Sequence, residues 1–200
     1  MKKNRWLKRL SLLFLVLIGG LGFLIWDFFQ DETVSQLTIN QTYDAYNEFK
    51  LLKNNRWVML IDNSDYESQD ELEDERVDNY PEEVYPEMTF LEGIYKKEGD
   101  KYYFCVLKSA TITFKSVKAV KEKKIFKKAI KVEKEKNYIS DPILVKQDDV
   151  YIYKDIYIEQ DENGREKVSV EDVEVYPSDN HIPNSVSQFL KQFKLVSSTK

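Results

Sequence analysis

The stretch MTFLEGIY (88–95), KKEGD (96–100) and KYYFCVLK (101–108) decides how this chain folds. Two apolar arms flank a polar loop of five residues that contains a glycine, which is typical of a β-hairpin. In the second arm both alternating sets of side chains are apolar, so we expect a strand that is buried on both faces. The pattern predicts an antiparallel sheet with Cys105 packed in its centre.

A second hairpin is predicted nearer the C-terminus. It joins Val150–Glu159 to Glu166–Tyr176 through Asn163-Gly164, a pair that suits the positive φ angles of a tight turn. The apolar residues of the second arm change from even to odd positions, which predicts a β-bulge near Glu171–Asp172. A further strand is expected at Trp57–Ile61, a continuous apolar run.

Two helices are predicted beside these strands. Thr42–Leu52 has apolar residues at helical spacing, so residues 30–55 are expected to be a juxtamembrane helical segment. Near the C-terminus, Ser185 and Gln188 form a capping-box pattern at the start of an apolar stripe. Residues 115–138 fit both strands and a helix, and the two alternatives stay open.

The N-terminal residues have the features of a membrane anchor. Residues 10–29 form a mostly apolar run of roughly 20 positions, which in a helix is about as long as the hydrocarbon core of a bilayer is thick. Residues 1–9 carry cations and no acid, whereas acids follow the run, so the N-terminus is expected in the cytoplasm. The cationic flanks of the anchor are Lys2, Lys3, Arg5, Lys8 and Arg9.

The predicted fold class is α+β: an N-terminal transmembrane helix, then one extracytoplasmic domain with mainly antiparallel sheet and a C-terminal helix. Residues 1–9 are the basic cytoplasmic tail, 10–29 the single-pass signal-anchor helix in the lipid bilayer, and 56–200 the extracellular domain. The competing interpretation is a cleaved signal peptide with Leu10–Ile18 as its apolar region. The lysine- and tyrosine-rich composition, with a single cysteine, favours a bacterial cell surface.

Two blocks of like charge stand out in the outer domain. Asp62–Glu87 has twelve carboxylates against Arg76 alone, which predicts an acidic solvated loop or, as the alternative, a cation site. Lys115–Lys136 has ten lysines against three glutamates. It predicts an exposed lysine-rich element, or a surface for anionic polymer, for lipid headgroups or for the acidic block itself.

The candidate interaction surfaces lie on the second hairpin and in the basic block. The hairpin contributes tyrosines that share one face: Tyr151, Tyr153 and Tyr157. The basic block contributes five lysines: Lys121, Lys123, Lys124, Lys127 and Lys128. Both surfaces suit a protein partner or an anionic envelope polymer.

The sequence lacks the residue patterns of common catalytic and cofactor sites. His181 is the only histidine and Cys105 the only cysteine, so neither a multi-histidine metal site nor a thiolate cluster is possible. No nucleophile elbow, Ser-x-x-Lys motif, dinucleotide fingerprint or P-loop occurs. Residues 28–200 carry a net charge of about −9, which disfavours nucleic acid as a partner. No catalytic residue, cofactor or metal is therefore predicted.

These exclusions make a non-catalytic function the leading hypothesis. We expect a membrane-anchored extracytoplasmic interaction or accessory module that binds a cell-envelope component or a surface protein. The alternative is an immunity-type protein that neutralises a secreted toxin at the cell surface, with Asp62–Glu87 as a decoy for a cationic target. A carboxylate-dependent wall hydrolase stays open as well, because its two acids need no sequence signature.

Overall fold

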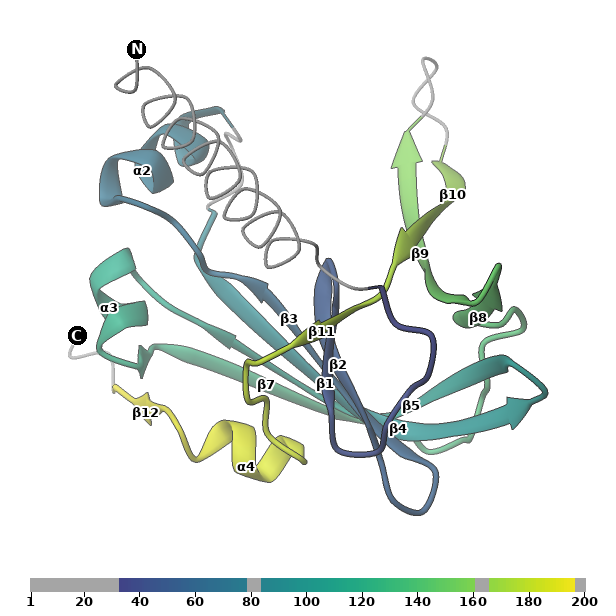
Figure 1. The fold of residues 1–200 in the computed structure, drawn as a ribbon. Helices are drawn as coiled ribbons and strands as arrows, with labels where there is room; N and C mark the ends of the chain where they lie inside the picture. Colours follow the sequence, from purple (N-terminus) through teal and green to yellow (C-terminus); the bar gives the residue numbers. More distant parts are fainter. Residues whose placement is uncertain (1–32, 79–83, 161–165, 197–200) are drawn as a thin grey trace, which may run out of the picture. The chain divides into compact units, whose positions relative to one another are not determined.

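Antiparallel strands dominate the computed structural model (Figure 1). The described residues are 33–78, 84–160 and 166–196, all within the compact unit Thr33–Lys200. Ten strands form one sheet: β1 (Thr42–Ala45), β2 (Asn47–Leu52), β3 (Arg56–Asn63), β4 (Glu87–Glu98), β5 (Lys101–Thr113), β7 (Lys127–Val132), β8 (Leu144–Gln147), β9 (Val150–Gln160), β10 (Glu166–Glu174) and β11 (Tyr176–Ser178). A small parallel pair joins β6 (Lys124–Ile125) to β12 (Lys194–Leu195). The helices described are α2 (Gln69–Asp78), α3 (Val117–Lys121) and α4 (Val186–Leu190).

The β4–β5 hairpin lies in the middle of the sheet, and the prediction of this hairpin is confirmed. Its turn is tighter than the expected five residues, because Glu98 already pairs with Lys101. Gly99 adopts a φ of 60° there, a conformation that glycine reaches without steric cost. Cys105 on β5 is fully buried, as predicted.

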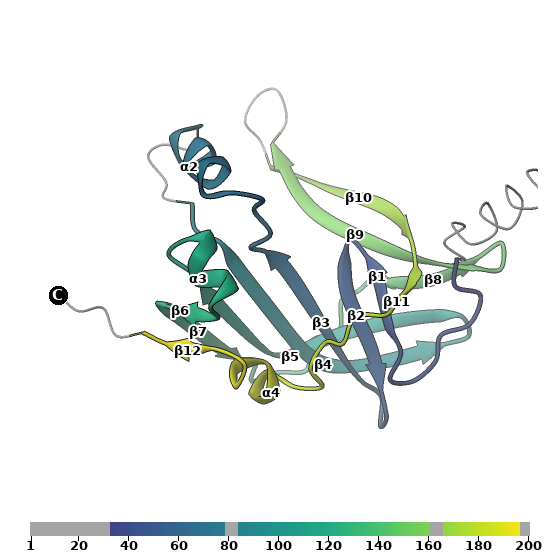
Figure 2. The same ribbon diagram turned by 60° about the vertical axis from the view of Figure 1, so that its left-hand side comes forward.

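The sheet closes on itself through one continuous stretch of chain. The strand order is β10-β9-β8-β5-β4-β3-β2-β1-β11, and only Val175 separates its two terminal strands in the sequence. Val175 is fully buried, donates its N–H to the Tyr151 carbonyl (3.0 Å) and accepts from the Val34 N–H (3.0 Å). The two ends of the strand order therefore meet, and the twisted sheet curls into a partial barrel (Figures 1 and 2).

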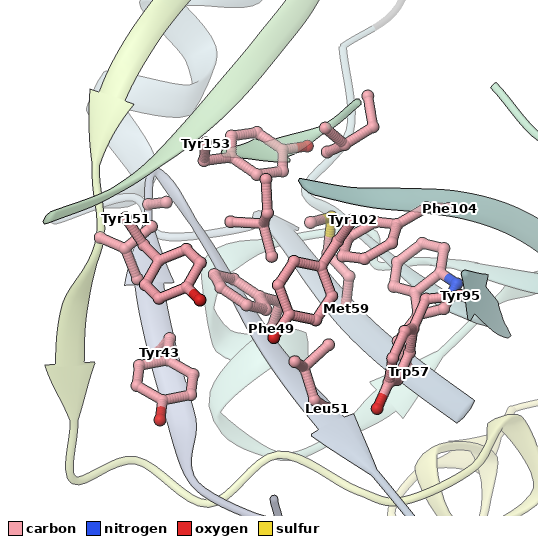
Figure 3. Close-up of a cluster of buried hydrophobic side chains, with 14 of the residues drawn as sticks. Tyr43, Phe49, Leu51, Trp57, Met59, Tyr95, Tyr102, Phe104, Tyr151 and Tyr153 are labelled. Carbon is pink, nitrogen blue, oxygen red and sulfur yellow. The ribbon is translucent and has the colours of Figure 1, made fainter. Parts of the chain in front are cut away.

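The two faces of the sheet carry separate cores, because side chains alternate along each strand. The face inside the curl holds what we call the aromatic core, whose large members include Tyr43, Phe49, Trp57, Phe104 and Tyr153 (Figure 3). The opposite face holds the second core, in which α4 packs Val186 and Phe189 against the strands. The ring centroids of Phe189 and Phe90 are 5.0 Å apart and those of Trp57 and Phe104 are 4.4 Å apart, so stacked rings anchor both cores.

A β-bulge in the β4–β5 hairpin is built around Gly93 and Trp57. The register shifts between Glu92 and Gly93, and the Trp57 indole N–H donates to the carbonyls of Ile94 (3.0 Å) and Cys105 (3.3 Å). A Cβ on Gly93 would lie 2.0 Å from the Cys105 oxygen and 2.6 Å from the indole nitrogen. Only glycine fits this position, because the Cys105 carbonyl and the Trp57 indole occupy the space where a side chain would begin.

The second hairpin and the C-terminal helix are also confirmed. Strand β9 pairs with β10, although the predicted Asn163-Gly164 turn lies outside the described residues. The Ser185 hydroxyl accepts from the Gln188 N–H (3.2 Å) at the start of α4, as the capping pattern predicts. The Gln188 side chain in turn accepts from Asn184 rather than from Ser185. The bulge expected at Glu171–Asp172 is wrong, because the β9–β10 register runs without interruption.

The predicted helix at Thr42–Leu52 is wrong, and residues 33–55 of the expected helical segment contain no helix. Strands β1 and β2 form a tight hairpin there, with Tyr46 at a φ of 64° in the turn. Tyr43 and Ala45 are buried on one strand, and Phe49 and Leu51 on the other. This spacing of two fits a strand, and the aromatic residues that also matched a helical pattern are themselves common in sheets.

The α+β assignment is wrong as well: the fold is mainly antiparallel β, and its helices in the described residues are short. The expected fold also included a single-pass transmembrane helix. No helix within residues 33–78, 84–160 and 166–196 is long and apolar enough to cross a membrane. The tail, the anchor at 10–29 and its cationic flanks lie outside the described residues.

Both charged blocks have more regular structure than the sequence indicated. The acidic block was expected to be a loop, but α2 occupies its middle, because Leu72 is fully buried and fixes the helix to the domain. Residues 79–83 lie outside the described part of the chain. The ambiguous basic block contains both helix and strand: α3, β6 and then β7, which pairs with β5.

Candidate functional site

The inner face of β3, β4 and β5 changes from aromatic to polar along its length. At the closed end of the sheet it carries Trp57 and Phe104 in the aromatic core. Farther along, Thr89 and Thr111 lie opposite each other with their hydroxyl oxygens 2.9 Å apart, within hydrogen-bond distance. Beyond these threonines the face becomes charged and opens into a cleft.

Four cross-strand neighbours form the floor of this cleft. Asn63 on β3 pairs with Glu87 on β4, and Glu87 pairs with Thr113 on β5. Thr113 pairs in turn with Lys127 on β7. Because directly opposed residues have Cβ atoms about 5 Å apart, the row presents a carboxylate, a hydroxyl and an ammonium group at the ends of adjacent strands.

Helix α2 forms one wall of the cleft and is fixed to the domain by three side chains. Leu72 is its fully buried anchor. The Gln69 side chain accepts from the Val117 N–H at the start of α3 (3.1 Å). Arg76 donates to the carbonyls of Val84 (2.7 Å) and Lys115 (3.1 Å). These contacts direct the exposed carboxylates of α2 along the rim of the cleft.

The cleft has a volume of about 860 Å³ and an acidic lining. Its carboxylates are those of Asp62, Asp65, Glu71, Glu75 and Glu87, against the ammonium of Lys127. A second hollow of about 480 Å³ shares Asp62 and Asp65 with it and adds Asp44 and Glu48. Seven carboxylates therefore border two adjoining hollows, and their negative fields add over a concave surface.

Hydrogen bonds hold several of these carboxylates in place. Asp62 accepts from both the N–H (2.9 Å) and the hydroxyl (2.6 Å) of Ser64, while Glu71 accepts from the Glu67 N–H (2.7 Å). The Tyr66 hydroxyl donates to Glu75 (2.7 Å). Burial and this hydrogen bond raise the pKa of Tyr66 to about 12, so its phenol stays neutral and remains a donor at ordinary pH.

Aromatic side chains form the remaining wall. The ring centroids of Tyr85 and Phe126 are 5.1 Å apart, and the Arg76 guanidinium carbon lies 5.0 Å from the Tyr85 centroid. Lys115 lies 5.6 Å from the centroid of Phe126 in the same way. The wall already associates with cationic groups of its own chain, which shows that its ring faces accept such groups.

The structure separates the tyrosines that were predicted to share an interaction surface. Tyr151 and Tyr153 belong to the aromatic core, where they are buried beside Tyr102 and Phe49 (Figure 3). Burial raises the pKa of Tyr153 to about 12. Tyr157 alone of the three is exposed, farther out on β9. A surface made of all three tyrosines does not exist, because the sheet curls over the first two.

The five predicted lysines are all exposed, but they are distributed over several elements. Lys121 ends α3, Lys123 follows at a φ of 54°, and Lys124 lies on β6. Lys127 belongs to the floor of the acidic cleft, whereas Lys128, its neighbour on β7, points to the opposite face. Only Lys127 of the five therefore lines the cleft, a difference that no sequence pattern predicts because it depends on how β7 pairs with β5.

Ion pairs of the basic block stay within the block. Lys118 and Lys124 pair with Glu122, and Lys131 pairs with Glu133. No ion pair among the described residues joins these lysines to the acidic block, although Lys127 lines the cleft beside its carboxylates.

Metal and thiol chemistry find little support in the described residues. No three of their His, Cys, Asp and Glu side chains converge closely enough to hold a metal ion. Cys105 is buried, and burial raises the pKa of its thiol. His181 lies exposed in the segment before α4, away from the residues that line the cleft.

Comparison of the chain with models of known protein families, with curated proteins and with solved structures finds no match.

Proposed function

We propose that the chain is a non-catalytic interaction module that binds a cationic segment of a partner protein in the acidic cleft. The observation that carries this proposal is the lining of the cleft, where five carboxylates surround a hollow of about 860 Å³ with one lysine on its floor. Opposite charge on a concave surface attracts a partner and fixes its orientation.

The spacing of the carboxylates favours a peptide over a metal ion. They come from the end of β3, from the segment after it, from α2 and from the start of β4, so they are spread along the cleft. A calcium ion needs six to eight oxygens at one point, whereas lysine and arginine side chains of a peptide contact separate carboxylates. The aromatic wall of Tyr85 and Phe126, which already contacts Arg76 and Lys115, adds apolar surface for the stems of such side chains.

A second candidate function shares this surface. A protein that neutralises a cationic toxin needs an acidic face that competes with the toxin's target, and the two adjoining hollows supply one. Cells that carry the chain would then survive a cationic toxin that kills cells without it. Equal survival of both strains against a panel of such toxins argues for the accessory module instead.

The proposal is tested by titrating the full chain into a fluorescein-labelled peptide of alternating lysine and serine and following fluorescence anisotropy. The cleft variant Asp65→Asn/Glu87→Gln removes two lining carboxylates without changing side-chain size. Its matched control, Glu98→Gln/Asp141→Asn, removes the same charge from exposed positions outside the cleft. At roughly 0.7 kcal/mol for each lost ion pair, the cleft variant binds about tenfold more weakly than the control.

The same titration at higher salt measures how far the attraction is electrostatic. Affinity for the cationic peptide falls as NaCl rises from about 0.05 M to about 0.5 M, because the screening length shortens. A peptide with glutamate in place of lysine does not bind. If the cleft variant and its control bind equally well, the cleft is not the binding site.

A further inference from the structure

Two long strands of the sheet have an edge without a partner strand. Among the described strands, β7 pairs only with β5 and β10 only with β9, as does the three-residue β11 with β1. Each edge exposes apolar side chains: Ile130 (49%) and Val132 (64%) on β7, and Val168 (64%) and Val170 (57%) on β10. An open edge offers unpaired backbone N–H and C=O groups, and these strands add exposed apolar residues to them.

The two edges carry opposite charge. Strand β7 has three lysines and no acid, so its net charge is +3. Strand β10 has four acids and one lysine, so its net charge is −3. Pairing of β7 with β7, or of β10 with β10, brings like charges together, whereas pairing of β7 with β10 brings opposite charges together.

We propose that copies of this chain associate edge to edge, with β7 of one copy pairing antiparallel with β10 of the next. The exposed apolar residues fix the register: Ile130 lies opposite Val170, and Val132 lies opposite Val168. Alternate residues share a face, so these two pairs lie side by side on the same face of the joined sheet. The contact covers four side chains that are otherwise exposed to water.

The charged residues agree with this register without further adjustment. Within the two strands Lys128 lies opposite Asp172, and just beyond the end of β7 the same register places Glu133 opposite Lys167 and Lys134 opposite Glu166. The remaining positions of β7 face Glu171, Ser169 and Val173, so no like charges are opposed. A shift by two residues in one direction places Val132 opposite Glu166, and a shift in the other places Ile130 opposite Asp172, so either shift loses one of the two apolar pairs.

Existing ion pairs within the hairpin extend the pattern. Lys154 on β9 bridges Asp172, and Glu159 on β9 pairs with Lys167 (3.0 Å). Adding Lys128 and Glu133 of the next copy produces rows of alternating charge across three strands. Since the two edges differ, the contact is heterologous and joins copies head to tail into a ring or an open chain.

The proposal is tested by sedimentation of the full chain over a range of concentrations. A nonionic detergent matched in density to the solvent keeps the apolar run Leu10–Trp26 from driving association itself. Ile130→Lys blocks the β7 edge, and Val170→Lys blocks the β10 edge. Val77→Lys on α2, where the valine is 75% exposed, is the matched control because it adds the same charge away from both edges.

The expected result is that the mean mass of the unmodified chain and of the Val77 variant rises with concentration. Each edge variant alone keeps the mass of a single chain, because every copy lacks one of the two edges. An equimolar mixture of the two edge variants forms a complex of one copy each, because each supplies the edge that the other lacks. Thermal unfolding checks that both variants remain folded.

A charge exchange then tests the register. Lys134→Glu and Glu166→Lys each weaken association roughly threefold, and the chain with both changes regains the original affinity. A single-chain mass for the unmodified protein at every concentration overturns the proposal. Edge variants that associate as strongly as the unmodified chain overturn it equally.

Discussion

The two ends of one sheet face have opposite characters, although the same strands β3, β4 and β5 build both. At the closed end, Trp57 stacks on Phe104 and Phe49 stacks on Tyr153 of β9, and the face is an aromatic core. At the open end, Glu87 and Thr113 form the floor of an acidic cleft. Closure by β9, β10 and β11 thus determines where this face can bury apolar side chains.

The largest expected effect breaks the closed end. Gly93→Ala places a Cβ 2.0 Å from the Cys105 oxygen and 2.6 Å from the Trp57 indole nitrogen. The backbone and the indole cannot both stay in place, so the free energy of unfolding falls by about 4 kcal/mol or more. Urea denaturation followed by tryptophan fluorescence measures the loss.

The control for this substitution is Gly99→Ala, at a glycine that is needed for its backbone conformation rather than for space. Gly99→Ala meets no atom within 4 Å, but its φ of 60° strains a residue with a side chain. Its cost is about 1 kcal/mol, the usual penalty for a left-handed residue other than glycine. Equal losses at Gly93 and Gly99 contradict the steric account of the bulge.

A pair of substitutions compares the two ends directly. Phe104→Ala removes a fully buried ring from the closed end and lowers the free energy of unfolding by about 3 to 5 kcal/mol. Thr111→Ala removes a partly buried hydroxyl between the aromatic core and the cleft, and lowers the free energy of unfolding by about 1 kcal/mol. Chemical denaturation of both variants in one buffer compares the two losses of unfolding free energy. Similar losses would refute the proposed difference between the closed end and the open end.

The buried phenol of Tyr153 predicts a pH dependence that belongs to the closed end. Burial raises its pKa from 10.0 to about 12, so between these values the folded state keeps a proton that the unfolded state has lost. Its contribution to stability is complete below pH 10 and declines as the pH rises to about 12, by on the order of 2 kcal/mol.

This contribution is measured as the difference in unfolding free energy between the unmodified chain and Tyr153→Phe from about pH 9 to pH 12. The difference shrinks with rising pH, because the variant has no phenol to ionise. Tyr157→Phe, at an exposed position on the same strand, is the control. A difference that stays constant with pH shows that Tyr153 does not ionise as its burial requires.

The smallest effect on stability is expected at the open end. Glu87→Gln keeps the shape of a partly exposed side chain and changes the free energy of unfolding by less than about 0.5 kcal/mol. A large loss would mean that the carboxylate holds the fold together, and the cleft would then be structural. A small change in the free energy of unfolding together with weaker peptide binding indicates that the Glu87 carboxylate serves binding rather than folding.

The strands that were predicted from the sequence have strong local signals. Trp57–Ile61 is a continuous apolar run, and the two long hairpins combine apolar arms with glycine-containing turns, so these patterns depend on neighbouring residues alone. The helix expected at Thr42–Leu52 failed because Ala45, Phe49 and Leu52, which have helical spacing, are equally well buried in strands β1 and β2. Pairing with β3 and β11, which is a contact between distant residues, decides in favour of strands.

The candidate site was only partly predictable for the same reason. The acidic block was evident, and it supplies most of the lining of the cleft. Thr113 and Lys127 come from elsewhere, and only the register of β4, β5 and β7 brings them beside Glu87. The burial of Tyr151 and Tyr153 likewise follows from the curl of the sheet, which no local pattern encodes.

The most direct measurement is a nuclear magnetic resonance titration of the full chain, labelled with nitrogen-15, by the lysine–serine peptide. The account predicts that the largest amide shifts map to the floor of the cleft, at Asn63, Glu87 and Thr113, and to α2. Strand β10 is also acidic and serves as the internal comparison. Shifts concentrated on β10, or spread evenly over all acidic surfaces, would contradict the claim that the cleft is the binding site.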